Sequence, residues 1–194
     1  MTSSKLDQNE ETAFNSPIPI FHYFKNLIFG DKNPSIFQLI MIYFNLMVWL
    51  IFFIWHILSY YAIAYREIIL SEKKVNIEIM ILNRGSELGY DPALFLDNLL
   101  NFHRLSIVCW ILVLVSIIFM WRKKLVFVYF LFGSIIFYYI SMIYFLGTTY
   151  YFEDTTLLDK ISIPVMLLNS IFLFMLIKNE DHSGEKFFGI EETE

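Results

Sequence analysis

The chain has 194 residues, of which 57% are hydrophobic and 17% are charged, and its formal net charge at pH 7 is −5. Soluble domains usually contain about 45–50% apolar and about 25% charged residues, so this composition argues against a soluble domain. The acidic residues lie in the tails and loops, and there is no basic patch with interleaved aromatic residues. We therefore expect no direct binding of nucleic acid.

Four apolar stretches, each at least 17 residues long, contain no Lys, Arg, Asp or Glu: Asn33–Tyr65, Leu105–Trp121, Leu125–Phe152 and Ile161–Ile177. About 20 apolar helical residues are needed to cross a bilayer core of about 30 Å. A soluble helix needs a charged face toward water, which these stretches lack. The sequence therefore predicts an all-α membrane protein, a four-transmembrane-helix bundle with a partly ordered exterior loop and helix between the first two spans.

The expected domain organisation follows from these stretches. A disordered polar tail over 1–17 and an interfacial segment over 18–32 precede a transmembrane domain over 33–178, and an acidic, loose tail over 179–194 follows it. The expected spans are about 35–65, 103–121, 125–148 and 160–178, with the exterior loop over 66–104.

The first apolar stretch is too long for a perpendicular crossing, since 33 helical residues measure about 50 Å. Tyr60, Tyr61 and Tyr65 cluster at its end, where aromatic residues with polar tips mark a membrane interface. We therefore expect the helix to project beyond the bilayer. Pro34 suits its first turn.

The segment between the first two spans contains three local signals. Val75–Leu82 carries apolar residues at period two, a strand-like pattern that its other apolar residues blur, and Asn83–Ser86 is typical of a turn. Asp91 and Pro92 form a strong helix start, because Asp caps free N–H groups and Pro has a helical φ. No breaker follows before Trp121, so we expect one helix of about thirty residues that enters the membrane from this loop.

The short loops predict the orientation. Arg122–Lys124 alone joins the second and third spans, so these form an antiparallel hairpin whose basic turn belongs in the cytoplasm. Glu153–Lys160 carries three acids and one Lys, which gives that loop little reason to stay inside. Both termini are then cytoplasmic and 66–104 is exterior, although five cations in that longer loop argue the other way. The Ile-, Phe-, Asn- and Lys-rich, Ala-poor composition is typical of AT-rich bacterial genomes, so we expect a bacterial inner membrane.

Small or polar residues recur along one face of every span, mostly at seven-residue intervals. They are Gln38, Asn45 and His56 in the first span, Ser106, Cys109, Val113 and Ser116 in the second, Ser134, Tyr138, Ser141 and Thr148 in the third, and Ser162 and Asn169 in the fourth. We interpret these stripes as packing contacts between helices. The alternative is that they line a polar path, for which His56 is the best candidate.

No catalytic, cofactor or metal site is expected. Haem between helices needs paired histidines on facing spans, whereas only His56 is clearly intramembrane and His103 lies at a boundary. Cys109 is the only cysteine, so an intramolecular disulfide is impossible. One cysteine and scattered histidines also offer few ligands for a zinc site. Phosphate loops and dinucleotide fingerprints are missing.

Three classes of function stay open. The first is a non-enzymatic membrane accessory or scaffold protein that contacts a protein partner or a second copy of itself. The second is an oligomeric pore-forming or permeability-altering effector, for example in a bacterial defence system or as a CRISPR-associated membrane accessory. The third is an intramembrane enzyme or quinone-handling protein, which the aromatic third span could suit.

Overall fold

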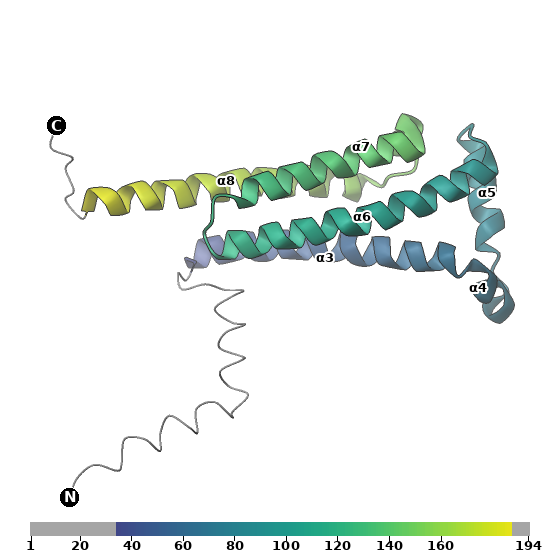
Figure 1. Ribbon diagram of the computed structural model, residues 1–194, viewed down its shortest axis with the longest axis horizontal. Helices are drawn as coiled ribbons and strands as arrows, with labels where there is room; N and C mark the ends of the chain where they lie inside the picture. The colour runs from purple at the N-terminus through teal and green to yellow at the C-terminus, as the bar shows by residue number, and fades with distance from the viewer. Residues whose placement is uncertain (1–33, 188–194) are drawn as a thin grey trace, which may run out of the picture.

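Every regular element in the described part of the chain is a helix. The computed structural model describes residues 34–187, with side chains from 34 to 180. The helices are α3 (Ile36–Ala64), α4 (Arg66–Lys73), α5 (Ile77–Glu87), α6 (Pro92–Trp121), α7 (Phe127–Glu153) and α8 (Leu157–Phe187), as Figure 1 shows. The expected tail over 1–17 and interfacial segment over 18–32 lie outside the described residues.

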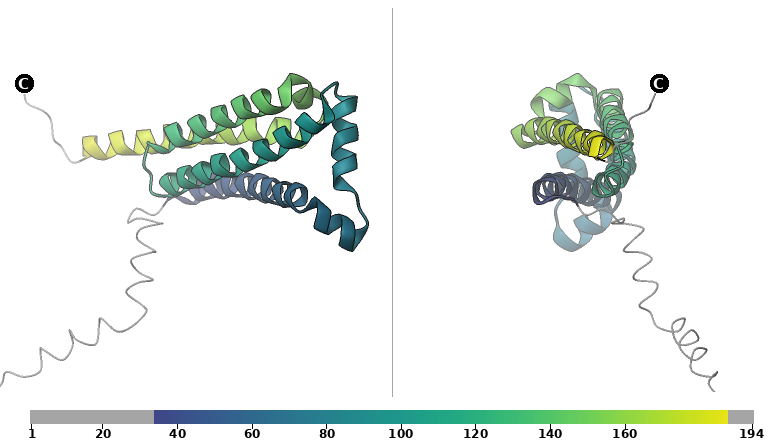
Figure 2. Two further views of the ribbon diagram at one scale, coloured as in Figure 1. Left: turned by 45° about the vertical axis from the view of Figure 1, so that its right-hand side comes forward. Right: turned by 90° about the vertical axis from the view of Figure 1, so that its left-hand side faces the viewer.

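Four helices are long and apolar enough to cross a membrane: α3, α6, α7 and the Leu157–Glu180 part of α8. Each packs against the next in chain order, and α8 packs against α3, so the four form a bundle (Figure 2). The chain is thus a multi-pass helical bundle, compatible with an integral membrane protein. We call the end where α4 and α5 cross the bundle the cap end, and the end with the α6–α7 turn the hairpin end (Figure 1).

The helix starts follow local capping chemistry. The Ser35 side chain accepts a hydrogen bond from the backbone N–H of Gln38, and the Gln38 side chain accepts one from the backbone N–H of Ser35. This capping box begins α3, so Pro34 precedes the cap and does not lie in the first turn as expected. Asp91 caps α6 and Pro92 is its first residue, and α6 runs for 30 residues to Trp121 as predicted.

The strand-like interpretation of Val75–Leu82 is wrong, because most of this segment lies in helix α5. The Asn76 side chain accepts a hydrogen bond from the backbone N–H of Ile79 and so caps the helix. The sequence pattern resembled a strand because apolar residues lie on both sides of this short helix. One side packs on the bundle and the other is exposed, so apolar residues recur at every second position.

The predicted turn at Asn83–Ser86 is also helical. Gly85 is required there by packing, since a Cβ atom at this position would lie 2.9–3.0 Å from side-chain atoms of Phe95 in α6. The chain turns later, at Gly89, whose φ of 81° is in the left-handed region.

Two corrections concern α7 and α8. Gly147 interrupts α7 with φ 73° and ψ 172°, so the seven-residue spacing of Ser134 and Ser141 does not carry over to Thr148, which is exposed. Helix α8 continues to Phe187, so the tail expected to be loose is helical up to that residue.

Candidate functional site

The structure places most of the predicted stripe residues inside the bundle. Ten of them are buried, namely Gln38, Asn45, His56, Ser106, Cys109, Val113, Ser116, Ser134, Tyr138 and Ser141, whereas Ser162 and Asn169 are half-buried and Thr148 is exposed. They do not form one site. The polar contacts that join helices lie at three levels along the bundle axis, whereas the hydroxyls of Ser134 and Ser141 donate to carbonyl oxygens of their own helix.

An ionic contact closes the hairpin end. The Gln38 side chain of α3 donates a hydrogen bond from Nε2 to Oε1 of Glu180 in α8, at 2.8 Å. Lys123, in the α6–α7 turn, forms an ion pair with Oε2 of the same carboxylate at 2.9 Å. Glu180 therefore joins three parts of the bundle at this end.

Amide groups join α3 to α8 near the middle of the bundle. Asn169 donates from Nδ2 to Oδ1 of Asn45 at 2.8 Å and to the carbonyl oxygen of Met41 at 2.9 Å. Asn45 donates in turn to Oγ of Ser170 at 3.0 Å. Buried amides in a bilayer must find partners, and here each amide group donates to an acceptor on the facing helix.

A histidine pair lies closer to the cap end. Nδ1 of His56 in α3 lies 2.9 Å from Nδ1 of His103 in α6, and both side chains are buried. An N–H···N bond at this distance requires one ring to carry its proton on Nδ1 and the other on Nε2. The rings of Phe102 and Tyr138 lie 5.6 Å and 5.5 Å from that of His56, both edge-on.

Sequence reasoning missed this pair, because Arg104 separates His103 from the uncharged stretch of α6 that begins at Leu105. The signal was its phase on the helix: His103 lies three residues before Ser106 and seven before Trp110, so all three share one face. Each of these three side chains is buried.

The pair is too close to hold haem. Imidazole nitrogens on opposite sides of a metal, at about 2 Å each, lie about 4 Å apart, whereas the two Nδ1 atoms are 2.9 Å apart. Across residues 34–180 no group of three or more His, Cys, Asp and Glu side chains could hold a metal ion. The geometry fits a direct hydrogen bond between helices.

Three polar atoms beside the pair have no hydrogen-bond partner: Nε2 of His56, Oγ of Ser106 and Nε1 of Trp110. The Trp110 ring stacks on Phe52 with centroids 4.8 Å apart, and Tyr138 lies edge-on to it at 5.9 Å. Rings thus enclose a polar patch between α3, α6 and α7. Such groups raise the cost of burial, and they make this the least satisfied part of the described core.

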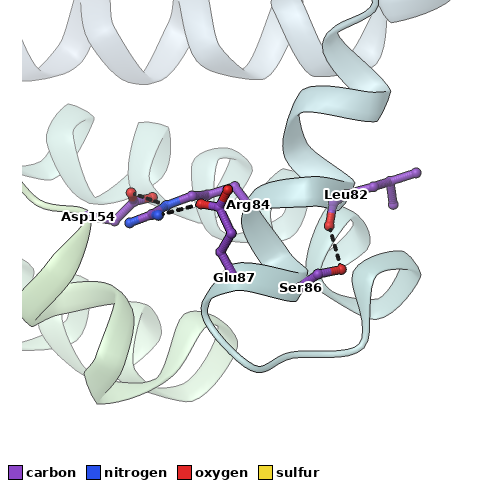
Figure 3. A network of polar contacts seen from close by, with 5 residues as sticks. All are labelled: Leu82, Arg84, Ser86, Glu87 and Asp154. Carbon is purple, nitrogen blue, oxygen red and sulfur yellow. Dashed lines mark hydrogen bonds and ion pairs between the residues drawn. The ribbon is translucent and has the colours of Figure 1, made fainter.

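The α4–α5 segment is clamped to the bundle. Arg84 in α5 donates from Nε to Oδ1 of Asp154, at the end of α7, at 2.9 Å, and from Nη1 to Oε2 of Glu87 at 2.7 Å (Figure 3). Hydrogen bonds to Glu87 and Asp154 raise the pKa of Arg84 above its ordinary value, so the guanidinium stays charged. A second ion pair, between Arg66 and Glu78 at 3.0 Å, joins α4 to α5.

Comparisons with protein families, curated proteins and solved structures give no match. The function is therefore inferred from the geometry of this chain.

Proposed function

We propose that this chain is a non-enzymatic membrane accessory protein that presents the cap, defined as residues 66–87, to a protein partner. The observation that carries this proposal is a set of apolar side chains on the cap that expose 42–64% of their surface: Ile68, Leu70, Val75, Ile79 and Met80. Large exposed apolar surface bordered by charged residues is typical of docking sites. Glu67, Glu72, Lys73 and Lys74 supply the charges.

The clamps on the cap support a docking role. Arg84 ties α5 to the end of α7, and Arg66 ties α4 to α5. Gly85 lets the cap approach Phe95 closely, and Tyr90 stacks on Phe95 with centroids 5.6 Å apart. A surface held in one arrangement before binding loses less conformational entropy when a partner docks.

The polar residues of the spans also favour a packing role over a chemical one. The Asn45–Asn169, Gln38–Glu180 and His56–His103 contacts each use a polar side chain of α3 to hold another helix. The proposal includes the orientation expected from the loops, with the cap outside a bacterial inner membrane and both termini in the cytoplasm.

The test compares two variants that add the same charge to α5. Ile79→Glu should reduce retention of the partner during purification from cells, measured by quantitative mass spectrometry, because it removes apolar contact area from the patch. Asn83→Glu adds a carboxylate on the same exposed helix without removing an apolar group, and should leave retention unchanged. Equal retention in both variants would contradict the proposal.

A second measurement separates docking to a protein from burial in lipid. A fluorophore on Met80→Cys, in nanodiscs that hold only this protein, should not be quenched by brominated lipids. Strong quenching would show that the patch lies among lipid chains, and would remove its role as a docking face.

A further inference from the structure

An apolar groove opens between the cap-end halves of α3 and α8. Its volume is about 460 Å³, and its lining includes Leu50, Ile54, Trp55 and Leu58 of α3 and, at the start of α8, Thr156 and Asp159. The groove lies on the cap-end side of the Asn45–Asn169 contact that joins α3 to α8. We propose that this groove binds one acyl chain of an aminophospholipid, with the ammonium group of the lipid beside Asp159.

The length of the groove fits a lipid chain. From Leu50 to Leu58 the groove follows α3 for about 12 Å, at 1.5 Å per residue. One leaflet contributes about half of the 30 Å hydrocarbon core. The side chains along this length are apolar except at the lip, where Thr156 and Asp159 begin α8. Trp55 lines the groove and is exposed, as is usual for tryptophan near the headgroups.

Other occupants fit less well. A helix that crosses the bilayer needs about 20 residues of contact length, but the Asn45–Asn169 contact closes the space between α3 and α8. A single chain from one leaflet avoids this problem.

The charge at the lip selects the headgroup. Oδ2 of Asp159 accepts hydrogen bonds from the backbone N–H and the hydroxyl of Thr156, each at 2.9 Å, which leaves Oδ1 as an acceptor at the groove. Lys160 donates instead to the carbonyl oxygen of Phe152 at 3.0 Å. Glu153 adds another exposed acid to the same loop. A negative lip favours an ammonium group and disfavours an anionic lipid.

The experiment is native mass spectrometry of the delipidated full chain, titrated with dioleoyl-phosphatidylethanolamine or dioleoyl-phosphatidylglycerol. We expect one phosphatidylethanolamine to be retained in preference to phosphatidylglycerol. Asp159→Asn keeps an oxygen that can cap α8 but removes the charge, so it should reduce this preference about threefold to fivefold, as for a partly exposed ion pair. Glu153→Gln is the matched control in the same loop and should preserve it.

The groove itself is tested by filling it. Ile54→Trp and, separately, Leu58→Trp should abolish retention of both lipids, whereas Ile143→Trp, on the outer face of α7, should not. Equal retention of the two lipids by the unmodified chain would overturn the headgroup assignment. Unchanged retention in both groove variants would overturn the site, and a dimer mass that disappears with Ile54→Trp would assign the groove to a second copy of the chain.

Discussion

Helices α6 and α8 both have the length and composition of membrane spans, yet they are held in different ways. Of the 18 most apolar consecutive residues of each helix, 39% are buried inside the protein in α6 but only 28% in α8. Helix α6 contributes large buried side chains such as Phe102, Trp110 and Met120 along its whole length. Helix α8 also buries apolar side chains, namely Ile163, Met166, Leu173 and Ile177, and it is hydrogen-bonded to α3 through Asn169, Ser170 and Glu180.

The difference shows what selects neighbours inside a bilayer. Lipid chains are as apolar as leucine, so burial of apolar area gives little net drive for helix association. Close packing and hydrogen bonds must then decide which helices stay together. Helix α6 packs large buried rings against α3 and α7, whereas less of α8 is buried and side-chain hydrogen bonds of Asn169 and Glu180 tie it to α3. We therefore expect α8 to separate before α6 when the protein is destabilised.

The largest effect on stability should come from a substitution in the packed core around α6. Trp110→Ala removes a fully buried ring that stacks on Phe52 and touches Tyr138. We expect a loss of about 3 kcal/mol in the free energy of unfolding, at the lower end for such changes because lipid also solvates the separated helices. Unfolding in mixed micelles would measure it. Ile111→Ala, exposed on the same helix, should change stability by less than about 0.5 kcal/mol.

The kink in α7 should be the next most sensitive position. Gly147 has φ 73° and ψ 172°, a region essentially reserved for glycine, and a Cβ atom there would collide with Tyr90. Gly147→Ala should cost about 1–3 kcal/mol and loosen the cap, seen as faster hydrogen exchange in α5. Gly133→Ala is the control, since no atom lies within 4 Å of the added Cβ. It should be neutral or stabilising.

Substitutions at the Asn45–Asn169 contact test directly how α8 is held to α3. A double-mutant cycle with Asn45→Leu and Asn169→Leu should give a coupling energy of about 0.6 kcal/mol, and at most about 1.7 kcal/mol. Spin-label distances between α3 and α8 should broaden in these variants while those between α3 and α6 stay sharp. Equal broadening of both distances would mean that the bundle opens as one unit.

The histidine pair should behave like the amides. His56→Phe should cost about as much as loss of one interhelical hydrogen bond, about 0.6 kcal/mol, and should leave partner retention intact. Loss of cellular function with unchanged abundance and assembly would instead assign His56 a chemical role. Scalar coupling between the two Nδ1 nuclei in ¹⁵N-labelled protein would detect the shared proton.

The smallest expected effect is on ion flux. The purified protein in liposomes should pass no ions by itself, because most of its stripe residues are buried inside the bundle and its outer faces are rich in Ile, Leu and Phe. Mass determination in nanodiscs should accompany the flux assay. An oligomer with steady unstimulated conductance would favour the pore-forming class over the accessory class.

Part of this architecture could be predicted because it depends on local chemistry. The absence of charge over each long stretch identified the four long apolar helices, Asp91 and Pro92 identified the start of α6, and the short basic run after Trp121 required a hairpin. The cap could not be predicted in the same way. Ile77–Glu87 is helical because Asn76 caps it and because it packs closely on α6, with Gly85 against Phe95.

The sequence by itself determined the number of spans and the face of each span that carries polar groups, since both follow from uncharged length and helical periodicity. Only the tertiary structure decided which polar groups meet. His56 and His103 are 47 residues apart, and Asn45 and Asn169 are 124 apart. Such pairs depend on the helix neighbours and on their relative heights, which packing sets. The groove beside Asp159 has the same origin, because its lining comes from α3 and α8, two helices far apart in the sequence.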